Sequence, residues 1–285
     1  MIEDRATRSL WREGPKALAA LTVTLALFFA IAFGFDASAV RVFLGLTPPL
    51  DVPYVGTRAA MVDTMLDMAQ VGPSDHVIDL GTGDGRILLA AAQQRGASGL
   101  GVDLDPTLID RANSVAANAD LSDRVTFVEQ DLFDTPLHDA DVVTMFLLPS
   151  VNLRLRQRLL AELQPGSRIV SNRFDMGDWR PDDVQRVGGY QAYLWIVPAD
   201  VEGVWRLDAG GTPIPIMLEQ SFQDIAGTAV IDGAPQTFTA TMRGENMRFT
   251  LNLPAGEQVF EGTVEGDLLT PVENVGWSAV REKAD

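Results

Sequence analysis

An uncharged apolar run near the N-terminus is the first strong feature of the hydrophobic pattern. Residues 17–35 contain no charged side chain in 19 positions and are rich in Leu, Ala and Phe. About 20 apolar residues are enough to cross a bilayer as a helix. We therefore expect a transmembrane helix or signal segment over residues 17–39, preceded by a basic flank at residues 1–16.

Two other interpretations of this apolar segment stay open. Ala37-Ser38-Ala39 has the small-residue spacing of a signal-peptide cleavage site, although apolar regions of signal peptides run to only about 7–15 residues. A buried core helix is the third interpretation, but no polar face interrupts the run. The basic residues before the segment place the N-terminus in the cytoplasm. A single span would then carry the rest of the chain across the membrane.

Short apolar runs alternate with segments of helical period through the middle of the chain. Strands are expected over residues 77–80, 99–103, 125–129, 141–147 and 168–171, and helices over 57–69, 86–95, 106–117 and 153–163. This alternation predicts βαβ units and a parallel, doubly wound sheet, and hence an α/β domain over residues 40–200. Two more runs, 184–187 and 190–197, flank Gly188-Gly189, which is a two-residue hairpin signal.

From about residue 201 the hydrophobic period changes to two. Phe238, Ala240 and Met242 alternate with threonines, and glycine-containing turns recur between such runs. No helical pattern interrupts them. The sequence therefore predicts a small all-β antiparallel domain over residues 201–285, either a sandwich or an open barrel.

Composition narrows the chemistry available to the chain. It has 22 basic and 39 acidic side chains, a net charge of −17. An acidic body repels phosphate backbones, which disfavours nucleic acid as a partner and favours a neutral or cationic substrate. Cysteine is absent, and the two histidines, His76 and His138, lie far apart. Both are expected in surface loops, and no metal site is expected.

A glycine-rich turn with an acidic partner carries the clearest chemical signal. Asp79–Gly85 follows the first predicted strand and opens a predicted helix, with Gly-x-Gly-x-Gly spacing. Arg86 stands where a dinucleotide fingerprint has its third glycine, which disfavours a pyrophosphate site and NAD. Asp103 ends the next predicted strand, where a carboxylate accepts hydrogen bonds from a ribose diol.

These segments resemble class I methyltransferases that depend on S-adenosyl-L-methionine (SAM). Asp79–Gly85 is similar to their motif I, Gly101–Pro106 to the acidic loop that follows, and Glu129–Leu132 to the segment that contacts adenine. The resemblance implies a Rossmann-like seven-stranded sheet that ends in an antiparallel hairpin. It also implies a SAM-binding set formed by Tyr54, Thr57, Asp79, Gly81, Thr82, Gly83, Gly85, Asp103, Leu104, Asp131 and Leu132.

Further motifs resemble a narrower, bacterial group. Pro53–Thr57, Gly83–Ile87 and Phe146–Pro149 are similar to segments of enzymes related to mitochondrial lysine methyltransferases of inner-membrane proteins, such as the ATP synthase c-subunit type. In that group the first segment folds over the methionine part of SAM. Gly56 stands where the group has proline, which is a departure from the pattern. The resemblance does not extend to the predicted β domain.

We therefore expect a SAM-dependent methyltransferase held by a single span in the inner or plasma membrane of a bacterium. The resemblance implies a protein lysine as acceptor. A small-molecule acceptor, and an exported binding protein without catalysis on the same fold, remain the alternatives. No residue is assigned as catalytic, because methyl transfer requires chiefly alignment. The oligomeric state is open.

A polar cluster follows the fifth predicted strand and has two interpretations. It consists of Arg173, Asp175, Asp178 and Trp179. These side chains either line a cleft for the acceptor or form a solvated loop with a packing tryptophan.

Overall fold

A computed structural model describes residues 56–273 and 276–282 of the chain. The predicted membrane segment at residues 17–39 and Tyr54 lie outside the described residues. Within the described ranges, no helix is long and apolar enough to span a bilayer.

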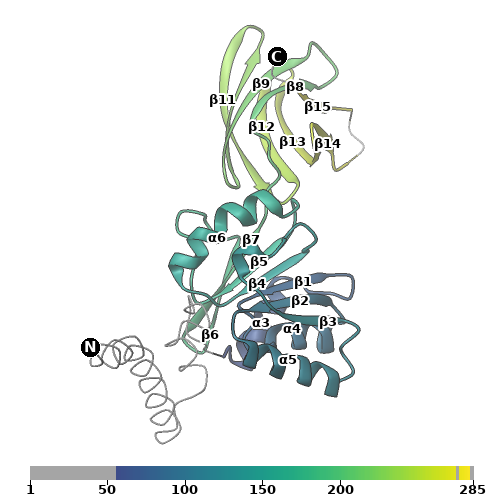
Figure 1. Cartoon of the computed structure of the whole chain (residues 1–285). Coiled ribbons are helices and arrows are strands. Elements are labelled where there is room, and N and C mark those ends of the chain that lie inside the picture. The colour runs from purple at the N-terminus through teal and green to yellow at the C-terminus, as the bar shows by residue number, and fades with distance from the viewer. Residues whose placement is uncertain (1–55, 274–275, 283–285) are drawn as a thin grey trace, which may run out of the picture. The chain divides into compact units, whose positions relative to one another are not determined.

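A mixed sheet of seven strands forms the first part of the described chain, in the order β3-β2-β1-β4-β5-β7-β6 (Figure 1). The strands are β1 (His76–Leu80), β2 (Ser98–Asp103), β3 (Val125–Glu129), β4 (Val142–Met145), β5 (Arg168–Asn172), β6 (Asp183–Val187) and β7 (Tyr190–Ile196). The first five run parallel, and β7 pairs antiparallel with both β5 and β6. The predicted Rossmann-like sheet with an antiparallel hairpin is confirmed.

Helices cover both faces of this sheet. They are α3 (Ala59–Met68), α4 (Arg86–Ala90) with a π-helical turn η1 (Ala91–Arg95), α5 (Pro106–Asn118) and α6 (Pro149–Glu162). Buried residues of α3, α4 and α5 share one apolar cluster, whereas those of α6 belong to the cluster on the opposite face (Figure 1). The sheet is therefore buried from both sides, as expected for parallel strands.

Two local expectations need correction. The helix predicted from residue 153 begins at Pro149, because proline fits the first helical position, where no amide donor is needed. His76 is not a loop residue but begins β1, where its side chain is half-buried beside Ser98. His138 is exposed, as predicted.

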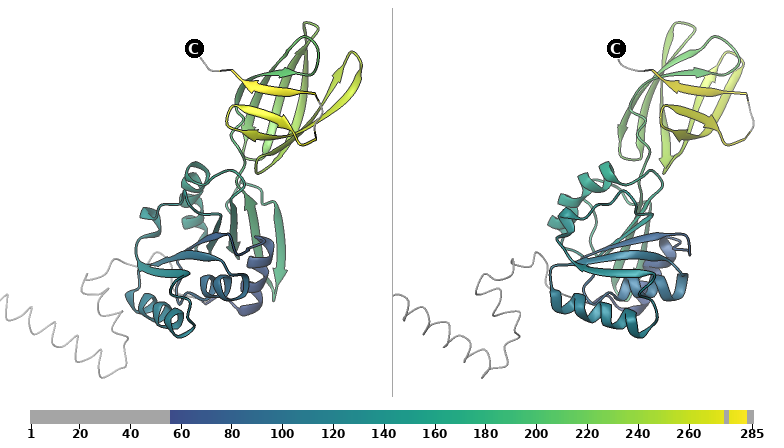
Figure 2. Two further views of the ribbon diagram at one scale, coloured as in Figure 1. Left: turned by 90° about the vertical axis from the view of Figure 1, so that its right-hand side faces the viewer. Right: turned by 45° about the vertical axis from the view of Figure 1, so that its right-hand side comes forward.

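Eight antiparallel strands close into a barrel in the second part (Figure 2). They are β8 (Gly203–Asp208), β9 (Ile214–Ser221), β10 (Asp224–Ile231), β11 (Ala234–Arg243), β12 (Asn246–Leu253), β13 (Gly256–Glu265), β14 (Leu268–Pro271) and β15 (Ser278–Arg281). The expected sandwich or open barrel is thus corrected to a closed barrel. Closure depends on the pairing of β15 with β8, and it leaves no sheet edge exposed.

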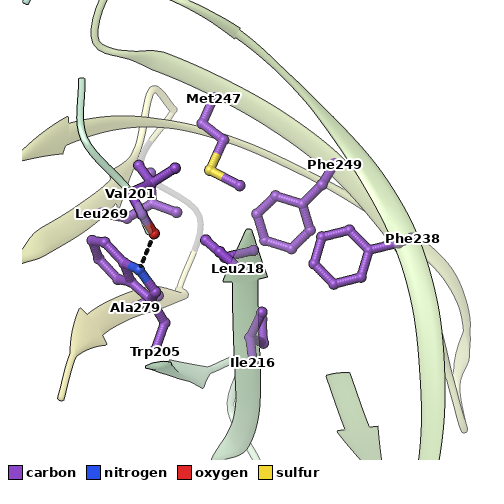
Figure 3. Close-up of a pocket in the computed structure, with 9 residues that line it drawn as sticks. All are labelled: Val201, Trp205, Ile216, Leu218, Phe238, Met247, Phe249, Leu269 and Ala279. Carbon is purple, nitrogen blue, oxygen red and sulfur yellow. Dashed lines mark hydrogen bonds between the residues drawn. The ribbon is translucent and has the colours of Figure 1, made fainter. Parts of the chain in front are cut away.

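Apolar side chains fill the barrel interior (Figure 3). Phe249 stacks between Phe238 and Phe260, with ring centroids 5.2 and 5.0 Å apart. The indole of Trp205 donates a hydrogen bond to the Val201 carbonyl. The remaining cavity of about 10 Å³ is lined only by apolar groups. Such a void is near the minimum for one water and offers it no polar partner, so the interior is a packed core.

Candidate functional site

The glycine turn between β1 and α4 has the backbone conformation that only glycine adopts readily. Gly81, Gly83 and Gly85 have φ angles of 72°, 56° and 78°, in the left-handed region that is costly for other residues. A Cβ atom at Gly81 would also lie 2.7 Å from the Leu147 side chain. The turn therefore follows the carboxyl end of β1 closely. The first backbone amides of the helix that comes next have no acceptor within that helix.

Asp103 connects this turn to the end of β2. Its carboxylate accepts hydrogen bonds from the Gly83 amide at 2.9 Å and from the Asp105 amide at 3.0 Å. Leu104 lies between them and is half-buried, while Asp105 caps α5. A carboxylate offers about four acceptor positions, so Asp103 retains acceptor capacity for a bound hydroxyl pair.

Asp79 is a buried carboxylate directly beneath the turn, with an exposed fraction of 1%. It accepts hydrogen bonds from the Thr82 and Thr144 hydroxyls, each at 2.7 Å. Burial raises the pKa of Asp79 to about 6, although both hydrogen bonds lower it. No cationic side chain among the described residues pairs with Asp79. A cationic ligand would therefore supply the missing partner.

Asp131 and Leu132 lie just beyond β3. The Asp131 carboxylate accepts a hydrogen bond from the Phe133 amide at 2.8 Å and caps a short 3₁₀ turn, Leu132–Asp134. Arg158 of α6 donates to the carbonyls of Leu132 and Phe133 and, at 2.8 Å, to that of Thr135. Thus α6 holds in place the turn that follows β3.

Thr57 lies at the start of α3 and is buried between two other elements. Its hydroxyl accepts a hydrogen bond from Asn172 at 3.3 Å, and its carbonyl accepts one from Arg86 at 2.9 Å. A Cβ atom at Gly56 would lie 2.6 Å from the Arg86 guanidinium. The departure from proline at this position therefore leaves room for that guanidinium.

Three contributors to the site were missed at the sequence level. Thr144 interrupts a buried apolar strand, and this single polar residue was the available signal. Asn172 and Arg158 gave no local signal, because their contacts join residues 115 and about 25 positions apart.

The polar cluster after β5 was expected either to line an acceptor cleft or to form a solvated loop with a packing tryptophan. Arg173 and Asp175 are exposed, and Asp178 forms an ion pair with Arg156. Trp179 is fully buried and packs against Trp195, with ring centroids 6.0 Å apart. Trp179 is therefore a packing residue and does not line an acceptor cleft. Among the described residues no group of acidic or histidine side chains forms a metal site.

Comparisons with known proteins agree with this geometry. The family model described as the ANTKMT methyltransferase domain matches residues 79–183. A protein-lysine N-methyltransferase of Saccharolobus islandicus is 36% identical over 151 residues, which cover 51% of this chain and 94% of that protein. An adenine nucleotide translocase lysine N-methyltransferase of Mus musculus is 37% identical over 172 residues, covering 60% and 73%.

One solved structure is also similar at the level of sequence. It is described as an RNA methyltransferase from Salinibacter ruber in complex with S-adenosyl-L-homocysteine. The two chains are 44% identical, with coverage of 52% of this chain and 96% of that chain and a TM-score of 0.51. The match concerns the methyltransferase part alone.

Proposed function

This chain belongs to the family of SAM-dependent protein-lysine N-methyltransferases, and from that premise we propose that it methylates the ε-amino group of a lysine in a protein. The resemblance to class I SAM-dependent methyltransferases is confirmed. The chain is a methyltransferase that uses SAM.

The buried carboxylate of Asp79 is the observation that carries the cofactor assignment. SAM bears an ammonium group in its methionine part, and Asp79 is a buried anion without a cationic partner among the described residues. We assign Asp79 to that ammonium, Asp103 to the ribose diol and Asp131 to the adenine amino group. The backbone of Gly81, Thr82, Gly83 and Gly85 would approach the methionine part, and Leu104 and Leu132 would approach the adenine ring.

Bound SAM supplies an electrophilic methyl group on a sulfonium. The protein must hold the acceptor nitrogen in line with that group and keep the nitrogen neutral. The segment after β4, Phe146–Pro149, is apolar and lies at the carboxyl edge beside the glycine turn. Burial of a lysine in apolar surroundings lowers its pKa and favours the neutral amine. This segment is therefore the proposed acceptor position.

We further propose that residues 17–39 anchor the protein in the inner or plasma membrane of a bacterium. The uncharged apolar run supports this location, and an anchor would raise the local concentration of integral membrane proteins as acceptors. Full-length protein is expected to stay with membranes after a carbonate wash and to keep its N-terminus. A mature N-terminus at Val40 would identify the segment as a cleaved signal peptide instead.

The proposed acceptor class leads to a prediction in the native host. Deleting the gene should remove lysine methylation from a small membrane protein, and proteomics of the membrane fraction measures this directly. The parent gene should restore the modification, and the variants Asp79→Ala and Asp103→Ala should not, because both alter the proposed cofactor site. Unchanged lysine methylation across the membrane fraction would refute a lysine acceptor there.

RNA is the rival acceptor, since the similar structure from Salinibacter ruber is described as an RNA methyltransferase. The net charge of −17 weighs against a polyanionic acceptor. Comparing methylated nucleosides in total RNA from the same parent and deletion strains separates the two. Loss of an RNA methyl group together with unchanged lysine methylation would favour RNA.

A further inference from the structure

Three segments converge on the side chain of Tyr190 at the carboxyl edge of the sheet. Tyr190 begins β7, Arg173 directly follows β5, and Arg58 directly precedes α3. The guanidinium carbons of Arg58 and Arg173 lie 5.5 and 5.0 Å from the centroid of the Tyr190 ring. Both distances are within cation–π range. One aromatic ring thus joins two cationic side chains from two other elements.

Ordinary ion pairing or core packing does not explain this arrangement. Neither guanidinium pairs with a carboxylate among the described residues, although the chain is strongly acidic. Tyr190 is 37% exposed as a residue and is not part of the core. Arg173 has a φ of 76°, which costs free energy for a residue other than glycine. Its amide donates a hydrogen bond to the Gln191 carbonyl, which holds it beside the β6–β7 hairpin.

The Tyr190 ring is also connected to the glycine turn through a short series of contacts. Arg58 directly follows Thr57, whose carbonyl and hydroxyl are held by Arg86 and Asn172. Arg86 is itself paired with Asp84 of the turn. Fixing Arg58 on Tyr190 therefore fixes residues 56–58 against the turn from the side of the hairpin.

We propose that Tyr190 is a positioning residue for SAM, because its ring holds residues 56–58 in place beside the glycine turn. The inference rests on the proposed function only in that the turn binds SAM. It does not depend on the identity of the methyl acceptor. Tyr190 acts through Arg58 and need not touch the cofactor.

Isothermal titration of the full-length protein with SAM tests this inference. Tyr190→Leu should raise the dissociation constant about 5- to 30-fold, because two cation–π contacts at an exposed site are lost together. Tyr190→Phe keeps the ring and should bind within about twofold of the parent. Loss of the two contacts should lower the melting temperature of Tyr190→Leu by a few degrees at most, whereas Tyr190→Phe should melt as the parent does.

Variants of the two arginines supply a second measurement. Arg58→Gln and Arg173→Asn should each weaken SAM binding by a smaller factor than Tyr190→Leu; asparagine tolerates the backbone conformation at position 173. Arg111→Gln, an exposed arginine of α5, is the matched control and should bind as the parent does. Parental affinity in Tyr190→Leu, or equal weakening in Tyr190→Phe, would overturn the inference. A parent protein that failed to bind SAM would refute the proposed function itself, and the inference with it.

Discussion

Replacing Asp103 by alanine is expected to weaken SAM binding by about 1.5–3 kcal/mol, which corresponds to roughly 10- to 150-fold in the dissociation constant. The carboxylate already orders the Gly83 and Asp105 amides, and we assign its remaining acceptor capacity to the ribose diol. Removing it takes away hydrogen bonds to a charged group and also frees the glycine turn. Both effects act in the same direction.

Isothermal titration of the parent and variant with SAM measures this difference. Asp110→Ala is the matched control, because Asp110 is an exposed carboxylate on α5 and its loss changes the net charge equally. The control should bind SAM as the parent does. An Asp103→Ala variant with parental affinity would show that the ribose assignment is wrong.

Replacing Asp79 by asparagine should stabilise the fold at alkaline pH and weaken SAM binding. The pKa of Asp79 rises from 3.8 to about 6 on folding because the carboxyl is buried. At pH 8 the folded protein must therefore keep a buried anion that costs about 3 kcal/mol. Asparagine removes that cost, and the hydroxyls of Thr82 and Thr144 can rotate to suit an amide.

The sign of the pH dependence follows from the raised pKa. Between about pH 4 and 6 the folded state retains a proton that the unfolded state has lost. The stability that this proton provides is present below pH 4 and is lost as the pH rises through 6. The advantage of Asp79→Asn should therefore grow over this interval and level off above it.

Two measurements check this prediction. Urea unfolding of parent and variant at pH 4 and at pH 8 gives the change in stability, and SAM titration at pH 8 gives the change in affinity. The variant should gain about 3 kcal/mol at pH 8 and little at pH 4. Its SAM dissociation constant should rise roughly 10- to 150-fold, as expected for a lost charged partner. A variant that is destabilised at pH 8, or that binds SAM normally, would contradict the assignment.

Most strands of the sheet and the glycine-rich motif after β1 could be predicted from the sequence. Period and length located β3 without error at Val125–Glu129, and the five parallel strands followed from alternation with helices. The glycine turn was recognisable because its conformation demands one residue type at fixed spacing. The junction of β2 and α5 could also be predicted, because Asp103 marks the end of the strand and Pro106 is a residue type that favours the start of a helix.

Long-range contacts account for what the sequence did not reveal. The contacts of Thr57 with Asn172, and of Arg58 and Arg173 with Tyr190, join segments far apart in the chain. No local pattern specifies such contacts. Closure of the barrel was missed because alternation predicts strands but not which strand pairs with the first. The burial of Trp179 likewise depended on packing against Trp195.

The fate of a labelled methyl group tests the central claim most directly. Full-length protein would be incubated with SAM tritiated on its methyl group and with membranes from the deletion strain, and the product hydrolysed for amino-acid analysis. The account predicts label in methylated lysine of a membrane protein, and roughly 10- to 150-fold less when the Asp103→Ala variant replaces the parent at a SAM concentration well below both dissociation constants. Label found in nucleosides or in a small molecule, with none in lysine, would contradict it.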